Sequence, residues 1–395
     1  MKFLVLLCIF IFIPWLFYYF HFSLLIIILS FLLPIIIVVQ YISYLFLHPK
    51  WHISTRNPKN GLPVKISGSA AQFYGSKITN PKIDFNIDFT EVEIDCLDKW
   101  PVLSSLEDAN DNHLTNLNLK HKSHILRAWF VLPNSNNNDI KTSTCILAVH
   151  GAGRDRRNFM RHLPIFHSSG YAVLLIDCRE HGISDSHGMG IGWASREAID
   201  VINAAYYIKY KLNYNKCVVL STSQGASASI IAAAYCGPKY VSNPLIDAVI
   251  AENPYSSKEL LMTTILDEFL GHNPYPLSLI LNSLQRLFSI LIVFIVNIRL
   301  GLSISKTSSF LLHSINHHHL NPIQVIHEIS PRPILLMHGT SDRTIPCQHS
   351  ELLYNEARNP KKIWFAEGAL HTAIYDKYPE LWKSTVLNFL KEYNL

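Results

Sequence analysis

Residues Val218–Ser229 read VVLSTSQGASAS, and the run IIAAAY follows them directly over Ile230–Tyr235. The apolar, β-branched residues at the start of this stretch are typical of a buried strand, and the small and aliphatic residues at its end favour a helix. Ser223 lies between the two, flanked two positions away by Ser221 and Gly225. The stretch therefore predicts a strand, a sharp turn and a helix, with the Ser223 hydroxyl at the tip of the turn.

A serine at such a turn is a candidate nucleophile, because a crowded strand-to-helix turn needs small residues two positions before and after it. Gly225 meets this requirement, and Ser221 is a small residue where a glycine is usual. A second S-x-S-x-G pattern surrounds Ser186, but it lies in a polar segment with no strand before it and no apolar helix behind it. We therefore expect Ser223, and not Ser186, to be the nucleophile.

A serine hydroxyl is a weak nucleophile without a base, so a histidine and an orienting acid are expected later in the chain. The run Pro333–Gly339 predicts a buried strand whose following loop carries Asp342. Lys362–Phe365 predicts a short strand, and the loop after it carries His371 ahead of a closing helix. We expect His371 to be the base and Asp342 the acid, with Glu252, at the end of another predicted strand, as the alternative acid.

A further predicted strand begins at Cys145 and leads into the glycine-containing loop His150–Gly153. Backbone N–H groups of such a loop can face the negative oxygen that forms when a serine attacks a carbonyl. We expect the N–H groups of Ala152 and Gln224 to form this oxyanion hole.

Four segments in this order resemble the α/β-hydrolase superfamily, from about Phe89 to the C-terminus. They are His150–Gly153, Asp177–Ser184, Ser221–Gly225 and the pair Asp342 and His371. The second segment is similar to the family pattern D-x-R-G-H-G-x-S, with Glu180 in place of the first glycine. The resemblance implies a mostly parallel sheet covered by helices on both faces, with an inserted helical cap. The group most similar in character comprises membrane-anchored serine hydrolases with a prolyl-oligopeptidase-like domain, which include esterases, lipases, thioesterases and peptidases.

Strands and helices alternate along the middle of the chain, as in a parallel sheet covered on both faces. Predicted strands are Ile83–Ile94, Ile125–Leu132, Tyr171–Ile176 and Ala248–Ala251, and Ile191–Tyr210 predicts a helix. The alternation stops after the last of these strands. We expect a membrane segment over residues 1–47, a linker over 48–82, and a catalytic domain over 83–395 with a cap insertion at about 253–329.

Apolar residues make up 49% of the chain and charged residues only 16%, a balance that favours membrane segments. Phe3–Phe20 and Leu24–Leu47 are apolar runs, and about 20 such residues span a bilayer. They predict an N-terminal transmembrane hairpin or a single anchor. Lys50 and Arg56 follow the second run, whereas only Lys2 precedes the first, so the catalytic domain is expected to face the cytoplasm.

The predicted cap contains the apolar run Leu287–Ile298, which is interpreted either as a core helix of the cap or as a face that dips into a membrane. A further span is disfavoured because the run is short and has Arg286 and Arg299 at its ends. The net charge of +5 without a dense basic tract excludes nucleic acid as a partner. Seven cysteines without a C-x-x-C pattern indicate reduced thiols. The adjacent residues His317–His319 cannot all converge on one metal ion, so we expect no metal site and no cofactor.

These features predict a membrane-anchored serine hydrolase that cleaves an ester or thioester with a lipid-like acyl chain. The expected partners are membrane lipid and a small-molecule or lipid ester substrate. A serine peptidase of the prolyl-oligopeptidase or aminopeptidase type is the second hypothesis. A catalytically inactive membrane scaffold is the third.

Overall fold

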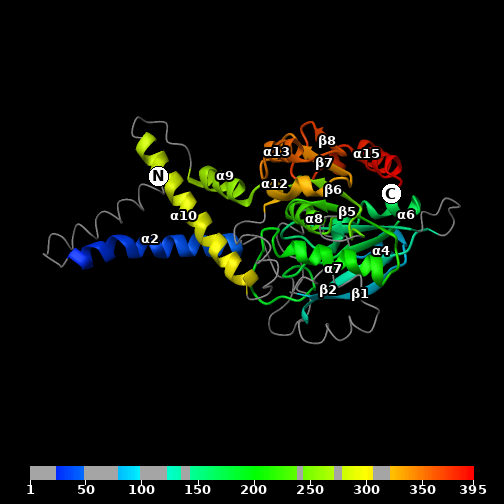
Figure 1. Ribbon diagram of the computed structural model, residues 1–395, viewed down its shortest axis with the longest axis horizontal. Coiled ribbons are helices and arrows are strands. Elements are labelled where there is room, and N and C mark those ends of the chain that lie inside the picture. The colour runs from blue at the N-terminus through cyan, green and yellow to red at the C-terminus, as the bar shows by residue number, and fades with distance from the viewer. Residues whose placement is uncertain are drawn as a thin grey trace. The chain divides into compact units, whose positions relative to one another are not determined.

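Two compact units make up the chain (Figure 1). One consists of Met1–Pro49 and Lys258–Leu302, and the other of Lys50–Ser257 and Ser303–Leu395. The computed structural model describes residues 24–48, 79–97, 122–134, 143–237, 243–270, 278–305 and 321–395.

The larger unit is built on one sheet of eight strands in the order β1-β2-β4-β3-β5-β6-β7-β8. The strands are β1 (Thr90–Leu97), β2 (Lys122–Val131), β3 (Thr144–Val149), β4 (Ala172–Ile176), β5 (Lys216–Thr222), β6 (Ala248–Glu252), β7 (Ile334–Gly339) and β8 (Lys361–Ala366). Strand β2 pairs antiparallel with both β1 and β4, and every other pairing is parallel. The predicted mostly parallel sheet is therefore confirmed.

Helices of the larger unit pack against the sheet and one another. They are α4 (Pro81–Phe85), η2 (Arg156–Phe159), α6 (Leu163–Ser168), α7 (Glu197–Tyr210), α8 (Gln224–Tyr235), α12 (Pro322–Val325), η3 (Ile326–Ile329), α13 (Gln348–Glu356), α14 (Ile374–Lys377) and α15 (Pro379–Glu392). Helix α8 contacts β5 and β6, α7 packs against α8, and α13 contacts β7 and β8.

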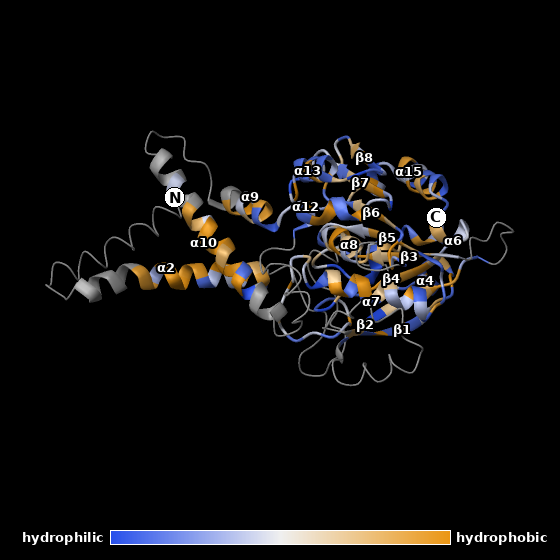
Figure 2. Cartoon of the chain, in the orientation of Figure 1, coloured by the Kyte–Doolittle hydropathy of each residue, from blue (hydrophilic) through white to orange (hydrophobic). Residues whose placement is uncertain are grey.

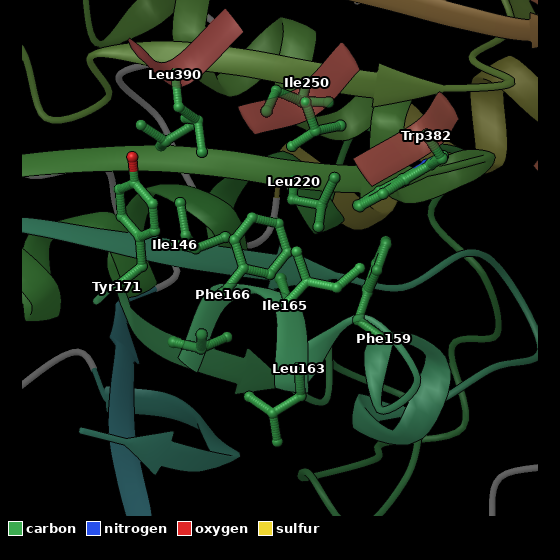
Figure 3. Packing of buried hydrophobic residues seen from close by; sticks show 14 of the residues in the cluster. Ile146, Phe159, Leu163, Ile165, Phe166, Tyr171, Leu220, Ile250, Trp382 and Leu390 are labelled. Atoms are coloured by element: carbon green, nitrogen blue, oxygen red, sulfur yellow. The ribbon is translucent and has the colours of Figure 1, made fainter. Parts of the chain in front are cut away.

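One core cluster lies between the sheet and helices α6 and α15 (Figure 3). Ile146, Leu220 and Ile250 come from β3, β5 and β6, and they share this cluster with Phe166 of α6 and Trp382 of α15. Successive strand residues point to opposite faces, and the neighbours of these residues along β3 and β5 are buried as well. Strands buried on both faces read as continuous apolar runs, which is why the sequence pattern located them.

Two predicted elements begin later than expected. The predicted strand Ile83–Ile94 starts instead with helix α4, because Asn80 accepts a hydrogen bond from the N–H of Ile83 and Pro81 occupies the first turn. Asn86 ends that helix in a left-handed conformation, and β1 follows.

The predicted helix Ile191–Tyr210 begins only at Glu197, the first residue of α7. The Glu197 carboxylate accepts a hydrogen bond from the N–H of Gly192 at 2.6 Å. Trp193 and Ala194 have φ values of 47° and 67°. The segment before α7 is thus a buried turn rather than a helical one.

The smaller unit contains helices α2 (Leu24–Leu47), α9 (Lys258–Leu270) and α10 (Ser278–Ser305) in its described part. Asn297 of α10 donates to Glu259 of α9 at 3.0 Å, and the Arg299 guanidinium donates to the side-chain oxygen of Gln40 on α2. Figure 2 shows α2 and the middle of α10 as strongly hydrophobic. Helix α10 has 28 residues and contains the predicted run Leu287–Ile298.

Within the described residues, none of the helices has the combination of length and apolarity needed to cross a membrane. The predicted first span, Phe3–Phe20, lies outside the described residues, as do His317–His319 and most of the predicted linker. The second predicted span coincides with α2.

Candidate active site

The turn at Ser223 joins β5, which ends at Thr222, to α8, which begins at Gln224. Ser223 has φ 55° and ψ −126°, a conformation that is strained for any residue with a side chain. The Ser223 N–H donates to the carbonyl of Glu252 at 2.8 Å, and its carbonyl accepts from the N–H of Ser227 at 3.1 Å. The neighbouring strand and the first turn of α8 therefore hold the strained residue in place.

Two glycines allow the backbone around Ser223 to pack closely. A Cβ atom on Gly225 would lie 2.2 Å from the carbonyl oxygen of His150, and one on Gly151 would lie 2.9 Å from Cβ of Ser223. Ser221, which replaces the usual glycine, is fully buried, and its hydroxyl donates to the carbonyl of Ile250 at 3.3 Å. The turn accommodates this serine because its hydroxyl has a partner.

The structure brings together the three residues predicted to act in catalysis. Nε2 of His371 lies 3.0 Å from Oγ of Ser223, and Nδ1 of His371 lies 2.6 Å from Oδ2 of Asp342. A neutral imidazole that donates from Nδ1 to the carboxylate accepts at Nε2, so the Ser223 hydroxyl donates to it. Ser223 follows β5, Asp342 follows β7, and His371 follows β8, so the three meet at the carboxyl edge of the parallel strands.

Asp342 is held as an anion by the groups around it. Its Oδ1 accepts from the N–H groups of Thr344 and Ile345 at 2.8 and 2.9 Å. Burial alone would raise the pKa of the Asp342 carboxyl, but hydrogen bonds from His338, His371 and the Ile345 N–H hold that pKa well below its usual range. An ionised carboxylate here orients His371 and stabilises the imidazolium form of its ring.

Comparison with known proteins supports the same architecture. No protein-family model matches the sequence. The uncharacterized protein YqkD from Bacillus subtilis is 26% identical over 275 residues, which cover 67% of this chain and 79% of that protein. The uncharacterized protein YfhR from Salmonella typhi is 23% identical over 278 residues, covering 67% and 77%.

Among solved structures, the esterase Pf2001 from Pyrococcus furiosus superimposes on 80% of this chain and 94% of its own, with a TM-score of 0.51 and 18% identity. The chain has the α/β-hydrolase fold. In this fold the serine stands on the turn after a central strand and the partners follow in the order acid, then histidine. Ser223, Asp342 and His371 occupy such positions in the sheet described above.

The two alternative residues weighed from the sequence lie in other hydrogen-bond networks of the α/β-hydrolase domain. Glu252 accepts from Nε1 of Trp382 at 3.2 Å, and burial raises the pKa of its carboxyl to about 7. The Ser186 hydroxyl donates to the Glu180 carboxylate at 2.7 Å. The hydrogen bonds of His371 go to Asp342 and Ser223 instead.

His150 orients the loop that carries the predicted oxyanion residue Ala152. Its Nδ1 donates to the carbonyl of Gly151 at 2.7 Å, and its Nε2 accepts from the N–H of Cys178 at 3.0 Å. Burial lowers the pKa of His150, so the ring is neutral at physiological pH, as this pattern of one donor and one acceptor requires. Gln224, the other predicted oxyanion residue, is the first residue of α8. The role of these two N–H groups stays a prediction.

Glu180, the other departure from the family pattern, organises the turn after it. It has φ 61°, where a glycine would be favoured. Its carboxylate accepts from the N–H groups of His187 and Gly188 at 2.8 and 3.1 Å and from the hydroxyl of Ser186. Burial tends to raise the pKa of Glu180, but these donors hold it below its usual value. The carboxylate therefore takes a structural role that a glycine lacks.

Asn253 is the residue near the site that the sequence did not predict. It directly follows β6 and its side chain donates to Oδ2 of Asp342 at 2.7 Å. The local sequence indicates only a left-handed turn here, because asparagine right after a buried strand is suited to one. The contact spans 89 positions of the chain, so no local pattern reveals it.

Proposed function

We propose that the protein is a serine hydrolase that cleaves a carboxylic ester or thioester through an acyl-enzyme on Ser223. The observation that carries this proposal is the chain of hydrogen bonds from Ser223 through His371 to Asp342, at 3.0 and 2.6 Å, on a strained strand-to-helix turn. A nucleophile, a base and an orienting acid within hydrogen-bond reach form the arrangement needed for acyl transfer.

The mechanism follows from this geometry. Nε2 of His371 accepts the hydroxyl proton while Oγ of Ser223 attacks the carbonyl carbon, and Asp342 supports the imidazolium that forms. Backbone N–H groups of Ala152 and Gln224 hold the oxyanion in this proposal. His371 then returns the proton to the leaving alcohol or thiol, and a water molecule activated by His371 hydrolyses the acyl-enzyme.

Several features favour a lipid-like acyl group and attachment to a membrane. Helix α2 has no charged residue, and the exposed side chains of α10 are largely apolar between Leu287 and Ile298.

In the proposed topology the N-terminal segment anchors the chain and the catalytic domain faces the cytoplasm. Extraction of membranes with alkaline carbonate and protease protection of sealed vesicles test this arrangement. Release by carbonate would contradict the integral anchor. Protection of the catalytic domain in vesicles whose cytoplasmic face points outward would contradict its orientation.

The activity is tested with a fluorophosphonate probe and a series of p-nitrophenyl acyl esters on detergent-solubilised protein. We expect the wild type to be labelled and to hydrolyse esters, and Ser223→Ala to lose both properties. Ser186→Ala is the matched control, because the Ser186 hydroxyl binds Glu180 and not His371. This variant is expected to keep its labelling. Ester hydrolysis that persists in Ser223→Ala would refute the proposal.

The two other hypotheses are separated by the same assay. Faster cleavage of aminoacyl amides than of acyl esters would favour the peptidase. Absence of labelling and of hydrolysis in the wild type, with and without added lipid, would favour the inactive scaffold.

A further inference from the structure

Asn253 has an unusual backbone for a fully buried residue. It follows the last residue of β6 with φ 52°, in the left-handed region, and it is inaccessible to solvent. Its N–H donates to the carbonyl of Met337 on β7 at 2.8 Å, so the β6–β7 ladder fixes its position. Asparagine and glycine are the residues that adopt this conformation most readily.

The side chain of Asn253 reaches the carboxylate predicted to orient the catalytic histidine. Its Nδ2 donates to Oδ2 of Asp342 at 2.7 Å, and the same oxygen accepts from Nδ1 of His371 at 2.6 Å. Two donors on one oxygen fix the direction of the carboxylate, because its other oxygen is held by backbone N–H groups.

The titratable neighbours of this carboxylate come from three elements. His338 on β7 places Nε2 3.4 Å from Oδ2 of Asp342, but that nitrogen also faces the carbonyl of Ile345 at 2.8 Å. His349 on α13 is neutral at physiological pH, since burial lowers its pKa to about 4. His371, on the loop after β8, is the third. Asn253 therefore donates a hydrogen bond to the Asp342 carboxylate without placing a further charge beside it.

Stability alone does not account for an asparagine at this position. The Oδ1 atom of Asn253 is buried and has no hydrogen-bond partner in the described part of the chain. A buried acceptor without a partner destabilises the folded state. The hydrogen bond from the Asn253 amide to Asp342 is therefore the contact that explains an asparagine at this position.

We propose that Asn253 is a positioning residue of the active site, whose amide holds Oδ2 of Asp342 toward His371 and stabilises the ionised carboxylate. This inference rests on the proposed function, since it assigns Asn253 a role only if Ser223, His371 and Asp342 act together. A hydrogen bond to the charged form of a carboxyl favours that form. Loss of the amide frees the carboxylate to rotate and weakens its hold on His371.

Asn253→Gly removes the amide while keeping a residue that tolerates the left-handed backbone. We expect kcat for an acyl ester to fall about 10- to 100-fold with KM little changed, which matches the loss of a hydrogen bond to a charged group. Asn213→Gly is the matched control, because Asn213 is also left-handed, with φ 58°, but is exposed in the turn after α7. That variant is expected to keep the kcat of the wild type.

Asn253→Asp tests whether residue 253 is electrostatically coupled to Asp342 and His371. It preserves the shape of the side chain and places a second carboxyl group against Asp342. Two carboxyl groups in one site bind a proton more readily, and a second negative charge favours the imidazolium of His371. Both effects move the acid limb of the pH profile of kcat/KM to higher pH, and we expect a shift of about one unit.

The outcomes separate this inference from the proposed function. If the wild type is neither labelled by the fluorophosphonate nor active, the proposed function fails first. If the wild type is active and Asn253→Gly keeps its kcat, the inference is refuted. If Asn253→Gly does not fold, the profile of Asn253→Asp decides, and an unmoved acid limb overturns the positioning role.

Discussion

At the scale of single residues, the candidate active site tolerates strain because neighbouring backbone groups determine its geometry. Ser223 is held at φ 55° because its N–H donates to a carbonyl of β6 and its carbonyl accepts from an N–H of α8. Gly225 lies so near His150 that a methyl group would not fit. Strained residues persist where the surroundings hold them in place. The proposed nucleophile is thus presented by packing, not by its own conformational preference.

His162 is a buried histidine for which we predict a clear effect of pH. Its ring packs against Phe159, Tyr375 and Trp382 at centroid distances of 5.3, 4.3 and 4.5 Å. Neither ring nitrogen has a hydrogen-bond partner in the part of the chain that is described. Burial, with a smaller contribution from Arg161, lowers the pKa of His162 to about 3, so the folded state holds the neutral ring.

In the unfolded chain this histidine binds a proton near its ordinary pKa of about 6.5. In the folded chain it binds a proton only at about pH 3. The stability of the wild type therefore falls as the pH drops from 6.5 toward 3. His162→Phe removes this loss and keeps an aromatic ring in the cluster. We expect it to raise the free energy of unfolding by about 2 kcal/mol at pH 5 relative to its effect at pH 8.

Urea unfolding of the wild type and His162→Phe at the two pH values measures this difference. His327→Phe is the control for removal of a histidine, because His327 on η3 is partly exposed. An equal change in stability at pH 5 and pH 8 would contradict the assignment of His162 as a buried neutral ring.

The sequence predicted candidate site residues that have a local pattern of their own, and it missed a contact that depends on strand order. Ser223 and Asp342 each stand after an apolar strand, and His371 stands after a half-buried strand, so each could be predicted from the pattern around it. The contact from Asn253 to Asp342 exists because β6 and β7 are neighbours in the sheet. Only the three-dimensional arrangement brings those strand ends together.

At the scale of elements, the buried strands were predicted well and the turns less well. A strand covered on both faces must be apolar throughout, so β4, β6 and β7 begin or end within a residue or two of the predicted runs. The segment before α7 was predicted to be helical because it contains apolar residues, but their burial comes from a tight turn at Trp193 and Ala194. Periodicity alone does not distinguish apolar residues buried in a helix from apolar residues buried in a tight turn.

Helix α10 is apolar on two sides, which an ordinary surface helix is not. One side is buried and includes Ile292, Val293 and Val296. The other exposes apolar residues at helical spacing, namely Leu287, Ile290, Leu291, Phe294 and Ile298. A helix of this kind is suited to contact with lipid on its exposed side.

A pair of substitutions on α10 tests this difference between its sides. Phe294 is 58% exposed, so Phe294→Asp is expected to leave the folding of the protein unchanged and to reduce its binding to phosphatidylcholine vesicles. Val296 is fully buried, so Val296→Asp is expected to destabilise the fold by at least about 3 kcal/mol, because a buried charge has no partner there. Vesicle co-sedimentation and thermal unfolding measure the two effects. Unchanged vesicle binding by Phe294→Asp would contradict a lipid contact through this side.

At the scale of the whole molecule, the chain joins a sheet unit with its own core to a helical unit assembled from distant segments. Met1–Pro49 and Lys258–Leu302 form one compact unit although more than half of the sheet unit separates them in the sequence. The buried cluster of the sheet unit draws on strands and on helices α6 and α15 of that same unit. Its stability is therefore expected to be largely independent of the first 49 residues.

Deletion of residues 1–49 tests this independence. Because Ser223, Asp342 and His371 all belong to the sheet unit, the truncated protein is expected to keep its fluorophosphonate labelling in detergent.

The remaining part of the helical unit loses its partner segment, so more apolar surface of α9 and α10 faces solvent, and such surface promotes association. We therefore expect the truncated protein to need detergent to stay monodisperse, as measured by light scattering during detergent removal. Loss of labelling would mean that the sheet unit depends on the helical unit, and a monodisperse protein without detergent would mean that α10 is not left uncovered.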